Sequence, residues 1–201
     1  MTVCQGSNCA SVWGAAERNK RAEAIDCHAP ACGCEQTSLR NPPGNPVGND
    51  ELIIRVLTSP DGFDVTNGEI LTRKLTALFS SGVSVIRQGA SDIEIRQTVS
   101  ELTNAAEPNC LVACVLVRVS AIRSLEGPER SFCVYDTEDS LKSHHADIVC
   151  PMPNMVSKNQ NRRKEEERRR SLRLVFEQHI KIVSDVKELI SAIREAEHAL
   201  T

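Results

Sequence analysis

Cysteine is concentrated at the amino-terminal end of this chain. Thiolates are soft ligands that hold zinc or iron–sulfur clusters, and they also pair as disulfides. Five of the nine cysteines fall in the first 34 residues, namely Cys4, Cys9, Cys27, Cys32 and Cys34. Four residues separate the first two of them, four separate the next two, and Gly33 permits a sharp turn before the last. This grouping predicts a metal site within residues 1–40.

The identity of the metal is less sharply specified than the site. Zinc takes four nitrogen or sulfur ligands in a tetrahedron, and four thiolates leave no open position for water, so a zinc ion here would be structural. An iron–sulfur cluster accepts the same ligands and remains the alternative cofactor. A disulfide, or small buried thiols without metal, would also explain the cysteines, although their odd number argues against a complete disulfide framework.

A second group of candidate residues follows later in the chain. His144 and His145 precede an expected strand, and Asp136 and Asp147 lie nearby. A histidine oriented by a carboxylate is the usual arrangement for general acid–base catalysis, and sites favour loops on a rigid scaffold. The group therefore predicts an alternative function, an enzyme acting on nucleotides or nucleic acid. It also fits ordinary polar residues of a surface loop, or ligands of a second metal.

A third candidate is the basic run Arg162, Arg163 and Lys164, which stands ahead of a heptad pattern. This layout resembles the leucine-zipper DNA-binding proteins, and the resemblance implies contact with nucleic acid through the basic residues. Three glutamates at 165–167 interrupt the basic face and would repel phosphates. A solvated helix with Glu–Arg pairs is the competing interpretation.

Composition limits the classes of protein to consider. The net charge of -3 gives no general attraction to nucleic acid or anionic lipid, and no 18-residue apolar run is present to cross a membrane. The first residues lack the basic and apolar regions of a secretory signal. We therefore expect a cytoplasmic protein with reduced thiols.

The elements that must position these groups fall into four parts. Residues 1–40 form the Cys-rich segment, and residues 41–50 form a Pro/Gly linker. Residues 51–156 alternate short apolar runs with helical patterns, which predicts an α+β domain on a mixed sheet. Residues 110–122 are rich in β-branched side chains and nearly continuously apolar, so we expect a central strand with both faces covered. Ser91 and Glu94 have the spacing of a capping box.

Residues 157–201 predict one long helix. Apolar residues repeat there in steps of three and four from Leu172 to Leu200, as in a coiled coil. The helix could pack on its own domain or associate with a protein partner or a second copy through residues 172–200. The leading prediction from the sequence is therefore a cytoplasmic metal-binding interaction protein.

Overall fold

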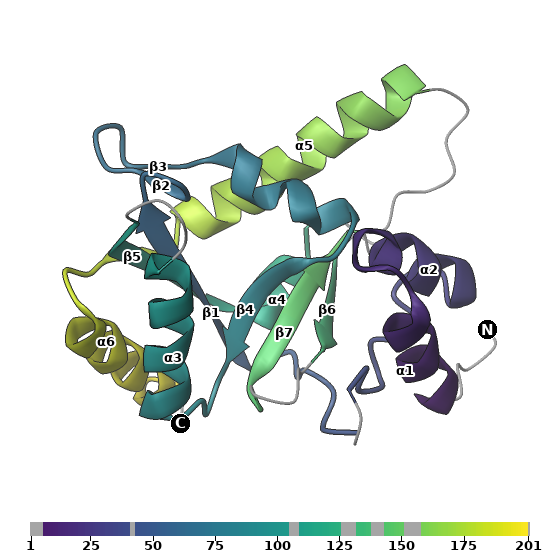
Figure 1. Ribbon diagram of the computed structural model, residues 1–201, viewed down its shortest axis with the longest axis horizontal. Helices are drawn as coiled ribbons and strands as arrows, with labels where there is room; N and C mark the ends of the chain where they lie inside the picture. Colours follow the sequence, from purple (N-terminus) through teal and green to yellow (C-terminus); the bar gives the residue numbers. More distant parts are fainter. Residues whose placement is uncertain are drawn as a thin grey trace.

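A six-stranded antiparallel sheet organises the fold in the computed structural model, which describes residues 6–40, 43–104, 109–125, 132–137, 143–150 and 158–200 (Figure 1). The strand order is β6-β7-β4-β1-β5-β8, and every pairing in it is antiparallel. The strands are β1 (Leu52–Ser59), β4 (Val83–Arg87), β5 (Cys110–Arg118), β6 (Cys133–Asp136), β7 (His145–Val149) and β8 (Ile180–Ile182). A second, two-stranded sheet consists of β2 (Phe63–Asp64) and β3 (Glu69–Ile70).

Helices cover both faces of this sheet. One face packs against η2 (Thr72–Phe79), α4 (Val119–Arg123) and α5 (Lys158–Glu177). The opposite face is shared between two pairs of helices (Figure 1). At the β1 and β5 end it carries α3 (Asp92–Thr103) and α6 (Val186–His198), and at the β6 and β7 end it carries α1 (Gly6–Ala15) and α2 (Arg21–His28). A short η1 (Arg18–Lys20) precedes α2.

The α+β class is confirmed, with two differences in the sheet. The sheet is antiparallel rather than mixed, and the predicted strand at 110–122 is not central. It ends at Arg118, where α4 begins, and only the edge strand β8 lies beyond it. Its apolarity has the expected cause, because Val115 packs into the core on one face and Cys114 into the core on the other. Burial of both faces did not require a central position, since β5 lies one strand in from the edge.

The Cys-rich segment packs directly on the sheet. Trp13 and Ile25 share a core with Tyr135 and Val149. The carboxylate of Glu35 is buried, accepts a hydrogen bond from the amide of Val134 at 2.7 Å and pairs with a guanidinium of α4. The segment predicted as a linker, described from residue 43, is also held, because carbonyls at 45 and 47 accept hydrogen bonds from arginines of the sheet and α4.

The prediction of a long helix after the core is confirmed for α5, but one unbroken helix to residue 201 is wrong. The segment Ile180–Ile182, in which two β-branched isoleucines flank a lysine, leaves the helix and pairs with β5. Asp185 then caps α6, accepting hydrogen bonds from the amides of Lys187 and Glu188. The apolar repeat is thus divided, with Leu172 in one core and Leu189 in the other. In the described residues, no helix is long and apolar enough to span a bilayer.

Candidate functional site: a histidine-lined cleft on the sheet

Strand alternation brings four polar residues to one face of the sheet. Successive side chains of a strand point to opposite faces, and cross-strand partners share a face. Val134 and Ile148 belong to the core under α5, so Thr137, His145 and Asp147 lie on the opposite face. Ser84 of β4 is the register partner of Asp147 and joins them. This face is bare between the two helix pairs, which leaves room for a cleft.

The cleft has a volume of about 430 Å³, within the range of small-molecule sites. Its floor is β1, β4 and β7, one wall is α3, and the other wall is η1 with the start of α2. Its polar lining consists of Arg18, Arg21, Arg55, Ser81, Ser84, Glu94, Thr98, Glu101, Thr137, His144, His145 and Asp147.

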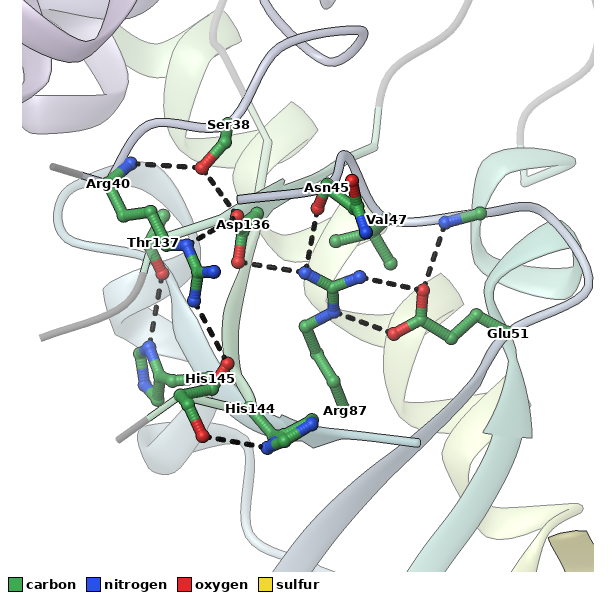
Figure 2. A network of polar contacts seen from close by, with 12 residues as sticks. Ser38, Arg40, Asn45, Val47, Glu51, Arg87, Asp136, Thr137, His144 and His145 are labelled. Carbon is green, nitrogen blue, oxygen red and sulfur yellow. Dashed lines mark hydrogen bonds and ion pairs between the residues drawn. The ribbon is translucent and has the colours of Figure 1, made fainter. Parts of the chain in front are cut away.

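A chain of hydrogen bonds determines that Nδ1 of His145 carries a proton. The hydroxyl of Thr137 donates to Oδ2 of Asp147 at 2.7 Å. It also lies 3.1 Å from Nδ1 of His145 (Figure 2). A hydroxyl has one proton, and a carboxylate only accepts, so the contact with His145 requires the imidazole to donate from Nδ1. In the neutral imidazole, Nε2 of His145 is then the nitrogen with a lone pair. The side chain of His145 is 20% exposed to solvent. The arrangement orients a general base in the way that catalytic triads do.

The second histidine is held by Glu94 of α3. Nδ1 of His144 lies 3.1 Å from Oε2 of Glu94, whose other oxygen accepts from the amide and hydroxyl of Ser143. The amide and hydroxyl of Ser91 also donate to Oε2 of Glu94, and the amide of Glu94 donates back to the hydroxyl oxygen of Ser91, which completes the predicted capping box. Burial alone would raise the pKa of Glu94, but these hydrogen bonds outweigh it and lower that pKa from 4.5 to about 2. The carboxylate is therefore ionised across the physiological range.

Arginines supply the positive charge of the cleft. The pairing of β1 with β4 covers Ile53 and Ile54 of β1. At the next residue of β1, the guanidinium of Arg55 donates a hydrogen bond to the carbonyl of Ser84. This is the one hydrogen bond of Arg55 among the described residues, and burial lowers its pKa despite attraction to Asp147. Nε of Arg21 is buried and lacks a hydrogen-bond partner within the same set of residues. The guanidinium of Arg21 also lies over the ring of Trp13, 5.2 Å from its centroid. Both guanidiniums thus keep N–H groups that could pair with an anionic ligand.

Gly82 allows the strand carrying Asp147 to come close. Its φ is +94°, a conformation that favours glycine, and a Cβ built there would lie 2.6 Å from Cβ of Asp147. A larger residue would displace either the turn into β4 or the carboxylate that orients Thr137.

Asp136, predicted with the two histidines, lies outside the cleft. Alternation turns it away from the face that carries Thr137. Its fully buried carboxylate instead pairs with Arg87 at 2.8 Å, accepts from the hydroxyl of Ser38 and faces Arg40 (Figure 2). Arg87 also forms a two-pronged ion pair with Glu51. Asp136 thus joins the amino-terminal segment to the sheet, while His144, His145 and Asp147 all line the cleft.

The predicted metal ligands are distributed over two disulfides. Cys9 is bonded to Cys34, and Cys32 to Cys133 of β6, with Cα–Cα separations of 5.9 and 5.4 Å. The thiol of Cys27 is exposed on α2. The remaining predicted ligand, Cys4, lies outside the described residues. A disulfide was one alternative to a metal that the sequence left open, and Cys133 is a partner that the amino-terminal spacing could not reveal.

The basic run lies on the exposed part of α5. Arg163 pairs with Glu167 and Arg169 with Glu166, each at 3.0 Å. These are the i,i+4 and i,i+3 pairs of the solvated-helix interpretation. Nucleic-acid binding through Arg162, Arg163 and Lys164 stays an untested prediction.

Thr137, Glu94 and Arg55 are site residues that the sequence did not single out. Glu94 carried a signal for its cap but none for its contact with His144, which is 50 residues away. Arg55 sits in the otherwise apolar run of β1, and a charged residue at that position was the available signal.

Replacing Glu94 by glutamine should make stability less dependent on pH. A lowered carboxyl pKa stabilises the fold above the unfolded pKa of about 4.5, and this contribution is lost as pH falls through about 2. At pH 6 we expect Tm to fall by about 3–6 °C, from the loss of about 1.5 kcal/mol in charge-assisted hydrogen bonds. The gap between variant and wild type should close between pH 4.5 and 2 in thermal melts. A gap that stays constant over this range would contradict the assignment.

The class defined so far is an α+β protein with a histidine- and arginine-lined cleft. No family model, curated protein or solved structure matches this chain, so functional assignment depends on the geometry of the cleft.

Proposed function

We propose that this chain is an enzyme in which His145 transfers protons at a small phosphate-bearing substrate. The observation that carries the proposal is the chain from Asp147 through Thr137 to Nδ1 of His145, at 2.7 and 3.1 Å. It leaves Nε2 for acid–base chemistry on the floor of the cleft. Polar residues that were only solvated would not need such directional pairing.

The class of substrate follows from the charges that remain available. The acids Glu94 and Asp147 are already engaged by hydroxyl and amide donors or by His144. Glu101 accepts a hydrogen bond from the side-chain amide of Gln97. Among the described residues, Arg55 makes one hydrogen bond, and Arg21 stacks on Trp13 with its Nε unpaired. Guanidinium binds phosphate oxygens through paired N–H groups, and 430 Å³ suits a single nucleotide-sized molecule rather than a strand.

The chemistry that this arrangement supports is hydrolysis of a phosphate ester. His145 takes a proton from water at Nε2 while the water oxygen bonds to phosphorus. The ester P–O bond breaks, its electron pair stays on the leaving oxygen, and that oxygen receives the proton from the imidazolium. Arg55 and Arg21 would stabilise the negative charge on the phosphoryl oxygens.

The test is a turnover and binding assay with aryl phosphates, aryl phosphodiesters and mononucleotides. Wild type should hydrolyse at least one of these classes. Thr137→Val keeps the shape of the side chain but removes the hydroxyl, so the orientation of His145 is lost. We expect kcat to fall by about 10–100-fold in that variant, with little change in KM.

Thr98→Val provides the matched control, because Thr98 lines the same cleft but makes none of the described contacts with His145. Its kcat should stay within about threefold of wild type. Neither turnover nor measurable binding of any of the three substrate classes would overturn the proposal. Turnover that survives Thr137→Val unchanged would remove His145 from the mechanism.

The metal-binding alternative has support in one part only. Cys9, His28 and Cys34 form a group that could hold a metal ion, although the two cysteines are bonded to each other. Association through residues 172–200 rests on the apolar repeat alone, and several of those apolar side chains are already buried within the chain.

A further inference from the structure

Two bonded cysteines and a histidine meet beside the sheet, away from the cleft. Cys9 lies in α1, His28 ends α2, and Cys34 lies in the turn that follows. One ligand atom from each lies within 4.8 Å of the others. These residues do not line the proposed catalytic cleft, so the arrangement needs a separate explanation.

We propose that Cys9, His28 and Cys34 form a redox-controlled zinc site. The disulfide is the closed form, in which neither sulfur is a thiolate. The reduced form binds one Zn²⁺ through both thiolates and the imidazole. His28 was not among the ligands predicted from the cysteine spacing.

The geometry fits tetrahedral zinc. With Zn–S bonds of about 2.3 Å, two thiolates on one tetrahedral ion lie about 3.8 Å apart. That separation is inside the 4.8 Å already enclosing the three ligand atoms. Reduction therefore requires only a small movement of side chains rather than a rearrangement of helices.

Burial indicates how the ion would enter and what completes its coordination. Cys9 and Cys34 have no exposed surface, whereas His28 is exposed. The ion would approach from the side of His28. Among the described residues no fourth ligand joins this group, so the fourth position would face solvent, where water can bind. Three protein ligands and one open position are typical of zinc sites that exchange ligands, unlike closed structural sites.

The redox step balances with a dithiol as the reductant. The dithiol gives two electrons and two protons to the Cys9–Cys34 disulfide and is itself oxidised to a cyclic disulfide. Two thiols result, and Zn²⁺ binding releases both protons as the thiolates coordinate. Removal of the metal and reoxidation restore the closed form.

The experiment compares zinc content in the full-length chain before and after reduction. Protein is treated with dithiothreitol under nitrogen, loaded with Zn²⁺, desalted and measured by elemental analysis, with free thiols located by mass spectrometry. We expect about one equivalent of zinc in reduced wild type and below one tenth in the oxidised protein. Cobalt(II) should give the visible spectrum of a tetrahedral thiolate site.

Variants assign the ligands. The double variant Cys9→Ser/Cys34→Ser should fall below one tenth of an equivalent. His28→Ala should weaken zinc binding by at least about tenfold, since even the loss of a residue that only hydrogen-bonds a metal ligand weakens binding that much. Cys27→Ser is the matched control, because this exposed thiol neighbours His28 but lies outside the ligand group, and it should bind as wild type does.

Three results would overturn the proposal. One is zinc held by oxidised protein in which Cys9 and Cys34 carry no free thiol. Another is a full equivalent in a folded Cys9→Ser/Cys34→Ser variant, which would assign the ion to other cysteines. If that variant fails to fold, an unchanged zinc affinity in His28→Ala decides against the site instead.

Discussion

Replacing His145 by glutamine is expected to lower kcat for phosphate-ester hydrolysis by about 10²–10⁴-fold, the usual contribution of a positioned general base. Glutamine can keep a hydrogen bond with the hydroxyl of Thr137, so the cleft should retain its shape. It cannot take a proton from water, however. KM should change little, because in the proposed mechanism the phosphate is bound by Arg55 and Arg21 rather than by the imidazole.

The control for this prediction is His198→Gln, at the exposed end of α6. It removes one imidazole without touching the cleft, so kcat should remain at the wild-type value. Equal kcat in His145→Gln and wild type would exclude His145 as the base.

Removal of the Cys32–Cys133 disulfide should have the largest effect on stability. The bond closes a loop between positions separated by 101 residues. Crosslinks over such loops stabilise by about 2–5 kcal/mol, chiefly by restricting the unfolded chain in the entropic model. We expect Cys32→Ala/Cys133→Ala to lose about 3–4 kcal/mol and about 6–16 °C in Tm, measured by urea and thermal unfolding without reductant.

Two comparisons make this measurement specific. Cys27→Ala removes an exposed thiol that is not in a disulfide. This variant should unfold at the same urea concentration and temperature as wild type. Reduced wild type should unfold near the double variant, apart from a further loss from the Cys9–Cys34 bond. If oxidised and reduced wild type share one urea midpoint, the crosslink does not stabilise the protein as argued.

The sequence predicted the class of fold because local patterns determine it. Apolar runs marked β1, β4 and β5, and the Ser91–Glu94 spacing marked the start of α3. Strand order was not predictable in this way, since it depends on which apolar faces meet in space. The break at 180–182 shows the same limit, because a repeat of three and four also permits a short strand that pairs with β5.

The candidate site was predictable in part for a related reason. His144, His145 and Asp147 are neighbours in the chain, so their proximity followed from sequence alone. Asp136 and Thr137 are adjacent, yet strand alternation sends only Thr137 to the cleft. The partners that come from elsewhere required the tertiary fold to be known, namely Glu94, Arg55 and Arg21.

Glu94 couples the folding of the first turn of α3 to the position of His144 in the cleft. The carboxylate of Glu94 accepts a hydrogen bond from the amide of Ser91, the residue that caps the start of α3. The same carboxylate contacts Nδ1 of His144. Fraying of the first turn would therefore release the imidazole, and a ligand that draws this imidazole away would loosen the turn. A ligand that binds His144 and local unfolding of the first turn of α3 would thus favour each other, because both break the contact between His144 and Glu94.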